Sequence, residues 1–306
     1  MSRRAIATVV AVVALVWASN TALAKHRVLF ARGGRLMSIG ANGRGSRLVA
    51  RLRHRRRIVA ISASANGIVL VRDNTGAWHW VDSKARRSRL VRLACAGVAH
   101  LAANGSRIVC TGDPKASQVY ELPSGGVHSI PLSLHQVAFK SRHGLELIAA
   151  RHGKLWAFPL ANYKAQRLLA PHAPATGLRV SPDGRRAVGR YRDGKDQRIF
   201  TFRLDGEAKR RRLLRNGTPV AWSADSVWLL AQARSMACIV RGVGGEFKCL
   251  RNYQALAIAP DGSFAILGHR DKRHHRTDLY KASLDGARTK KPTLFLRNTQ
   301  MAAAWY

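Results

Sequence analysis

The chain carries a short turn that recurs about every forty residues, and this repeat limits the fold more than any other feature. The turn residues are Asn66-Gly67, Asn104-Gly105, His143-Gly144, Asp183-Gly184, Asp225-Ser226 and Asp261-Gly262. Successive turns are 38, 39, 40, 42 and 36 residues apart, and each follows one short apolar run and precedes another. A period in this range with strand-like flanks is typical of one blade of a β-propeller. The expected fold class is therefore all-β.

Two of the repeats align closely, at residues 177–206 and 255–286. Each has the order apolar strand, Pro-Asp-Gly turn, apolar strand, polar loop, aromatic-containing strand, Asp-Gly turn and final strand. In such a turn proline presets φ, aspartate bonds its own backbone, and glycine takes the position with positive φ. The pattern predicts seven innermost strands, at residues 58–64, 97–103, 136–141, 177–181, 219–223, 255–259 and 301–306.

The two ends of the chain are expected to share one blade. Residues 27–31, 35–39 and 47–51 resemble a second, third and fourth strand, and the last strand of the chain supplies the missing innermost one. Closing the ring in this way removes exposed sheet edges. Seven blades over residues 25–306 give about 40 residues each. Six blades is the alternative, if the first unit is irregular.

The turn sequences resemble those of the TolB-like propellers, which are related to the WD-repeat group. The resemblance is carried by Val180-Ser181-Pro182-Asp183-Gly184, Ile258-Ala259-Pro260-Asp261-Gly262 and Ala221-Trp222-Ser223-Ala224-Asp225. As a fold signal it extends over nearly all of residues 25–306. It implies a propeller outside the cytoplasm with a non-catalytic binding role.

The first 24 residues are predicted to be a secretory signal peptide. Ser2-Arg3-Arg4 is a basic start, residues 5–18 are nearly all apolar, and Ala22-Leu23-Ala24 fits a processing site. A membrane-spanning helix is the alternative, but the apolar run is shorter than the roughly 20 residues that a bilayer requires. We expect a periplasmic or secreted propeller at residues 25–306, monomeric and without a transmembrane segment after processing.

Four cysteines agree with an oxidising compartment. Cys238 and Cys249 flank a glycine-rich hairpin tip and are expected to lie opposite each other, near disulfide range. Cys95 and Cys110 are then the second pair by elimination. Four free thiols are the alternative, and the absence of a C-x-x-C spacing argues against a metal site.

The net charge of +37 predicts attraction to polyanions without sequence preference. The basic loops at residues 51–57, 190–198 and 270–276 would project from one face of a propeller. The predicted contacts for an acidic protein or an anionic envelope polymer are Arg51, Arg53, Arg55, Arg56, Arg57, Arg192, Lys195, Arg270, Lys272, Arg273, His274, His275 and Arg276. The alternative is general basicity, because runs such as Arg86-Arg87 would lie on the other face. Nucleic acid is not expected as the main ligand, since no stripe of exposed aromatic residues accompanies the charge.

No catalytic constellation is recognisable. Most aspartates occupy turns, and Glu121 and Glu146 have no evident partner for acid–base chemistry. His269, His274 and His275 lie in a loop whose cationic neighbours disfavour a metal, so neither a metal nor another cofactor is expected.

Polar residues near the starts of innermost strands are expected to line the mouth of a central channel. They are His135, Thr176, Thr218, Gln254 and Gln300. The sequence thus predicts an exported, non-catalytic interaction scaffold. The alternative is a hydrolase or lyase acting on an anionic polysaccharide, which would require a pair of converging carboxylates.

Overall fold

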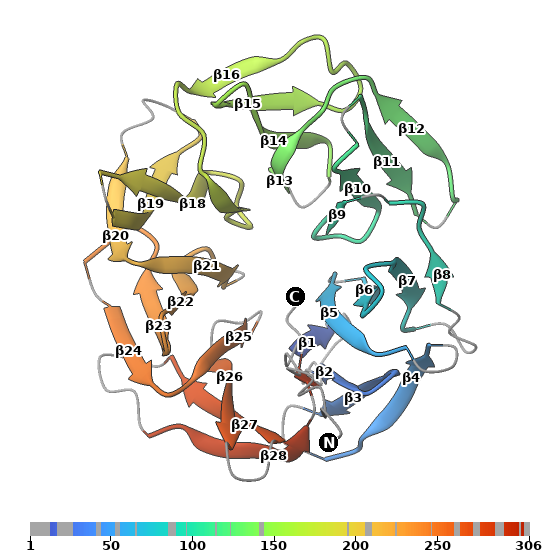
Figure 1. The fold of residues 1–306 in the computed structure, drawn as a ribbon, viewed down its shortest axis with the longest axis vertical. Helices are drawn as coiled ribbons and strands as arrows, with labels where there is room; N and C mark the ends of the chain where they lie inside the picture. The colour runs from blue at the N-terminus through green and yellow to red at the C-terminus, as the bar shows by residue number, and fades with distance from the viewer. Residues whose placement is uncertain are drawn as a thin grey trace, which may run out of the picture.

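The computed structural model shows seven small antiparallel sheets arranged as a ring around a central axis (Figure 1). The predicted seven-bladed propeller is confirmed, and the six-bladed alternative is wrong. The residues that the structure describes are 13–16, 27–40, 44–52, 56–64, 66–84, 90–95, 97–113, 115–122, 124–140, 144–194, 196–205, 210–223, 225–245, 247–259, 264–271, 276–284, 291–299 and 301–302, with the backbone alone at 13–16, 193, 247, 271, 276, 298–299 and 301–302.

Each blade has four strands in sequence order from the axis outward, and the first blade has one further strand from the end of the chain. The innermost strands are β1 (Val13–Val16), β5 (Ile58–Ala63), β9 (Val98–Leu101), β13 (His135–Phe139), β17 (Thr176–Val180), β21 (Gly217–Trp222) and β25 (Gln254–Ile258). The second strands are β2 (Arg27–Arg32), β6 (Ile68–Asp73), β10 (Arg107–Thr111), β14 (Glu146–Arg151), β18 (Arg186–Asp193), β22 (Trp228–Ala233) and β26 (Phe264–Asp271). The third are β3 (Arg35–Gly40), β7 (Trp78–Asp82), β11 (Ser117–Glu121), β15 (Lys154–Pro159), β19 (Asp196–Arg203), β23 (Met236–Arg241) and β27 (Arg276–Ser283). The outermost are β4 (Arg47–Arg51), β8 (Val91–Arg92), β12 (Val127–Ile130), β16 (Arg167–Ala170), β20 (Arg211–Arg215), β24 (Phe247–Arg251) and β28 (Thr293–Thr299).

The recurring turn connects the first and second strands, as its chemistry predicts. In the fifth blade the Ser181 hydroxyl accepts the Arg186 amide at 2.9 Å, and the Asp183 carboxylate accepts the Arg185 amide at 3.0 Å. Gly184 takes the left-handed conformation at φ +71°. The turn is thus closed by its own side chains, and the Asp183 amide also donates to Ser226 Oγ of the sixth blade at 3.0 Å.

The ring closes through both ends of the chain. Strand β29 (Met301–Ala302) pairs with β2, with Met301 opposite Ala31 and Ala302 opposite Phe30. The predicted pairing of the last residues with 27–31 is therefore confirmed for Met301 and Ala302, and residues 303–306 lie outside the described part. Strand β1 pairs with the same edge of β2, from Val13 opposite Phe30 to Val16 opposite Arg27. The sequence pattern placed these four residues in a signal peptide and did not predict a strand there.

Apolar packing joins neighbouring blades. One buried cluster brings Leu70 and Trp78 of the second blade against Ile108 and Tyr120 of the third. Trp78 and Tyr120 therefore help to fill the layer between these two blades.

Both expected disulfides are present. Cys238 and Cys249 lie directly opposite each other on β23 and β24, and Cys95 bonds Cys110 from the segment that precedes β9. In the part of the chain that the structure describes, no helix has the length and apolar character needed to cross a bilayer.

Candidate functional site

The disk has two faces that differ in how their charge is compensated. One face carries the turns between second and third strands and the connections from each outermost strand to the next blade. Backbone hydrogen bonds join these two kinds of connection, as from the Leu52 amide to the Gly34 carbonyl and from the Asn74 amide to the Arg57 carbonyl. We call this the arginine face. The opposite face carries the remaining turns, and we call it the mixed face.

Arginines repeat at strand ends on the arginine face. Six lie at or next to the ends of second strands, and four are the last residues of outermost strands. This arginine set is Arg32, Arg72, Arg151, Arg192, Arg234, Arg270, Arg51, Arg92, Arg215 and Arg251, and all but the half-buried Arg151 are exposed. The set surrounds the axis, because its members come from six blades.

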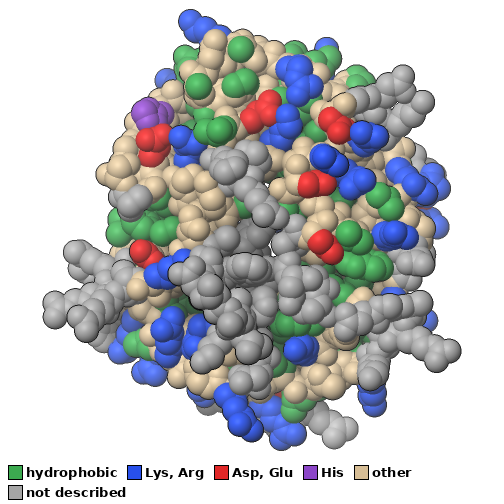
Figure 2. Space-filling model, turned by 180° about the vertical axis from the view of Figure 1, so that it is seen from behind, with side chains coloured by type: hydrophobic (Ala, Val, Ile, Leu, Met, Phe, Trp, Pro, Cys, Tyr) green, Lys and Arg blue, Asp and Glu red, His purple; other side chains and the backbone are tan. Residues whose placement is uncertain are grey.

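The two faces differ more in their acidic residues than in their basic residues. Among the described carboxylates that are not buried, six lie on the mixed face: Asp82, Glu121, Glu146, Asp183, Asp205 and Asp225. Figure 2 views the mixed face, where acidic side chains lie among the basic ones. On the arginine face the corresponding residues with described side chains are Asp113 and Asp196; Asp193 and Asp271, of which only the backbone is described, also end second strands there. Asp196 already pairs with Arg198 and Arg215 at 3.3 and 3.0 Å.

The predicted anion contacts whose side chains are described lie on the arginine face. Arg51 ends the first blade and Arg57 follows it, Arg192 belongs to the fifth blade, and Arg270 belongs to the seventh; all four side chains are exposed. Arg276 begins β27, with only its backbone described. The predicted contacts outside the described residues are Arg53, Arg55, Lys195, Lys272, Arg273, His274 and His275.

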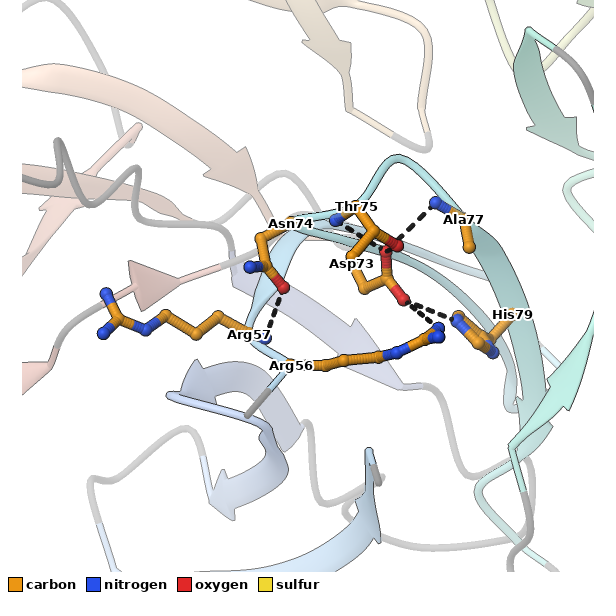
Figure 3. Close-up of polar contacts among 7 residues, drawn as sticks. All are labelled: Arg56, Arg57, Asp73, Asn74, Thr75, Ala77 and His79. Atoms are coloured by element: carbon orange, nitrogen blue, oxygen red, sulfur yellow. Dashed lines mark hydrogen bonds and ion pairs between the residues drawn. The ribbon is translucent and has the colours of Figure 1, made fainter. Parts of the chain in front are cut away.

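Arg56, another predicted anion contact, is bound within the protein itself (Figure 3). Its guanidinium donates to the Asp73 carboxylate at 2.8 Å, and His79 Nε2 lies 3.1 Å from the same oxygen. The second oxygen of Asp73 accepts the Thr75 amide and hydroxyl and the Ala77 amide at 2.9, 2.6 and 3.0 Å. Burial alone would raise the pKa of the Asp73 carboxyl, but the hydrogen bonds from Thr75, His79 and Arg56 hold that pKa well below its ordinary value.

The four predicted channel-mouth residues that the structure describes lie at the inner rim of the arginine face, where innermost strands begin. His135 and Gln254 are exposed and Thr218 is half-buried; the Thr176 hydroxyl is buried, with no hydrogen-bond partner among the described residues. Gln300 lies outside the described residues. Of the five, only Gln254 lines the central cavity found in the described structure.

The central cavity has a volume of about 420 Å³ and lies between six innermost strands. Its wall includes His100 and Arg179, neither of which the sequence analysis selected. A comparison of the repeats could have found them. His100 lies two residues before Ala102, and Arg179 lies two residues before Ser181, where recurring turns begin. Other repeats have alanine or serine at the position that His100 and Arg179 occupy.

Carboxylates in the described part of the chain do not converge on this cavity, since none is among its lining residues. Glu121 pairs with Arg107 at 3.1 Å, and Glu146 pairs with Lys140 at 2.5 Å. Within the described residues, no three His, Cys, Asp or Glu side chains gather as metal ligands would.

Comparisons with solved structures show the fold. The β-propeller domain of Cps50 (Swd1) from Myceliophteria thermophila matches with a TM-score of 0.58 and 16% identity, covering 83% of this chain and 92% of that one. Hydrazine synthase from Kuenenia stuttgartiensis matches with a TM-score of 0.54 and 12% identity, covering 72% and 75%. TolB from Acinetobacter baumannii has a TM-score of 0.48 and 15% identity, covering 88% and 65%, a likeness too low to bear on function.

The expected likeness to propeller repeat proteins is thus confirmed at the level of the fold. The matched structures include both a propeller domain and an enzyme, so the fold does not decide between scaffold and catalyst. No protein-family model and no curated protein matches the sequence.

Proposed function

We propose that this protein is an exported scaffold that binds an acidic partner, either an acidic protein or an anionic envelope polymer, through its arginine face. The observation that carries the proposal is the arginine set, which surrounds the axis on a face with few described carboxylates to compensate it. A positive field of this kind concentrates anionic partners and accelerates their association. The two disulfides support export, because such bonds persist in oxidising compartments.

A binding role is favoured over the hydrolysis or lysis of a polysaccharide. The lining of the central cavity contains no described Asp or Glu, and a glycosidase needs two carboxylates at one bond. Several of the described carboxylates outside the cavity are already paired with arginine or lysine, as at Asp196, Asp205, Glu121 and Glu146.

Retention on heparin tests which face binds anions. We expect a variant with Arg192, Arg234, Arg251 and Arg270 changed to glutamine to elute at clearly lower salt than the unaltered protein. The matched control changes four exposed arginines of the mixed face, Arg167, Arg185, Arg211 and Arg241, to glutamine. The slope of log Kd against log salt should fall by on the order of one unit for each arginine removed from the binding face, and by much less in the control. Equal shifts for the two variants would mean that only net charge matters and would contradict the proposed face.

A further inference from the structure

Three strands of the first blade bring two arginines and a serine together on one side of the sheet. Ser38 of β3 lies directly opposite Arg47 of β4 and, on its other side, opposite Leu29 of β2. Arg27 lies two positions before Leu29, so its side chain projects from the same side of the sheet as that of Ser38. Both arginines begin their strands and therefore lie at the mixed face, away from the arginine set.

The Ser38 hydroxyl binds both guanidinium groups. Its oxygen accepts the Nε–H of Arg27 at 3.3 Å and the Nε–H of Arg47 at 3.2 Å. Ser38 is buried, with 2% of its surface exposed, and no described residue accepts its own hydroxyl proton. Because a hydroxyl can donate one hydrogen bond as well as accept two, this group still has a donor for a bound molecule.

Neutral acceptors hold the two guanidinium groups. Arg27 Nη2 donates to the Gly45 carbonyl at 2.6 Å and to the Ser38 carbonyl at 3.5 Å. In the described part of the chain, no carboxylate pairs with either arginine, and the sequence has no Asp or Glu before Asp73. Burial and the neighbouring charge of Arg47 lower the pKa of the Arg27 guanidinium. A bound anion would relieve this repulsion.

The first blade is unusual at these three positions. In every blade the register defines an equivalent set, made of the first residue of the second strand, the third-strand residue opposite the position two further on, and the residue opposite that one on the outermost strand. From the second to the seventh blade the sets are Ile68, Trp80 and Val91; Arg107, Val119 and His128; Glu146, Ala157 and Arg167; Arg186, Thr201 and Arg211; Trp228, Ile239 and Lys248; and Phe264, Lys281 and Thr293. Of these six sets, one repeats the combination of two arginines and a hydroxyl, in the fifth blade.

The fifth blade satisfies its arginines and its hydroxyl internally. Arg186 lies within electrostatic range of the Asp183 carboxylate. The Thr201 hydroxyl donates to the Ala187 carbonyl at 3.3 Å. A counter-charge and an acceptor are therefore already present there, whereas the described surroundings of the first-blade cluster provide neither. The fifth blade thus supplies a matched comparison within the same chain.

We propose that Arg27, Ser38 and Arg47 form a binding site for a phosphate group, either as free phosphate or as a phosphomonoester. Phosphate carries a charge of about −1.5 to −2 near pH 7, which matches two guanidinium groups, and its oxygens accept several N–H and O–H donors at once. A carboxylate has a single charge and compensates one arginine. This site is independent of the arginine face, because it lies at the mixed face and takes a small anion.

Calorimetric titration with inorganic phosphate at constant ionic strength tests the site, with acetate as the singly charged comparison. We expect phosphate to bind with a Kd below about 1 mM and at least about tenfold more tightly than acetate. Arg47→Gln alters an exposed side chain and should weaken phosphate binding at least about tenfold. Arg211→Gln removes the equivalent exposed arginine of the fifth blade and should leave the affinity unchanged.

Ser38→Ala is a second variant, which removes the hydroxyl donor and keeps both charges. It should weaken phosphate binding at least about threefold, as expected for the loss of one hydrogen bond. In the unaltered protein, phosphate should shift the NMR signals of the Nε–H groups of Arg27 and Arg47. These two measurements keep the test decisive if Arg47→Gln does not fold.

Glycerol 3-phosphate separates the two sources of the phosphate group. An affinity at least equal to that of inorganic phosphate would support a phosphomonoester as the ligand, and weaker binding would support free phosphate. The proposal is overturned if inorganic phosphate does not bind at about 10 mM, which would saturate even a site with a Kd of about 1 mM. Equal binding of acetate, unchanged phosphate binding in a folded Arg47→Gln variant, or an equal loss in Arg211→Gln would overturn it as well.

Discussion

Replacing Asp73 with asparagine is expected to lower the free energy of unfolding by about 3–5 kcal/mol. The Asp73 side chain is fully buried and accepts hydrogen bonds on both oxygens. An asparagine can keep only one oxygen acceptor, so its amide group would face the Arg56 guanidinium and His79 with donor against donor. The Arg56 charge would then lose its counter-charge inside the second blade. Urea unfolding of both proteins at pH 7 measures the difference.

Asp205→Asn is the matched control, because Asp205 also pairs with an arginine but lies at the surface. Arg203 donates to Asp205 at 2.9 Å, and both side chains are substantially exposed. Solvent screens such a pair, so the urea midpoint should not change measurably. If the two substitutions have the same effect, the Asp73 cluster does not stabilise the blade as proposed.

The Asp73 cluster also predicts a direction for the pH dependence. The pKa of the Asp73 carboxyl is lower in the folded state than in the unfolded state. The carboxylate therefore contributes fully to stability above the unfolded-state pKa near 3.9, and this contribution is lost as the pH falls through the folded-state pKa. The stability of the unaltered protein should decline from about pH 5 downward. The difference in the free energy of unfolding between the unaltered protein and the Asp73→Asn variant should decrease over the same pH interval.

Removing the bond between Cys238 and Cys249 by a double alanine substitution is expected to cost about 3 kcal/mol. The two cysteines are 11 residues apart and join directly opposed strands of the sixth blade. The cross-link limits the unfolded chain, and the buried Cys238 side chain also contributes packing. Urea unfolding with and without a reducing agent measures both effects.

A variant with all four cysteines changed to alanine provides the control for the reductant itself. Its unfolding midpoint should not respond to reduction, whereas that of the unaltered protein should fall. An unaltered protein equally stable in oxidising and reducing buffer would contradict the stabilising role of both disulfides.

Local chemistry explains why the repeat was predictable. The Ser181–Asp183–Gly184 turn is closed mainly by hydrogen bonds within a few residues, so its own sequence favours its geometry. Once the turns are placed, the flanking apolar runs become the innermost and second strands. The disulfide of Cys238 and Cys249 was predictable for a similar reason, because the two cysteines flank a short glycine-rich hairpin tip and so lie opposite each other.

Contacts between distant residues explain what the sequence did not predict. The bond from Arg56 to Asp73 joins residues 17 apart, and a basic run gives no sign that one of its members is held internally. Arg179 and His100 are 79 residues apart and meet only because the ring closes. The apolar run at Val13–Val16 suits both a leader and a buried strand, and periodicity does not separate the two.

The edge of β2 accommodates two segments that compete for the same place. Val13 and Ala302 both lie opposite Phe30, so the C-terminal strand cannot extend along β2 while β1 occupies positions 27–30. If processing removes the residues before Lys25, that stretch of edge becomes vacant, and the register of β29 would bring Ala303, Ala304 and Trp305 opposite Leu29, Val28 and Arg27. Different strands would then close the ring in the precursor and in the processed chain. Slower amide exchange at residues 303–305 after processing would reveal this replacement.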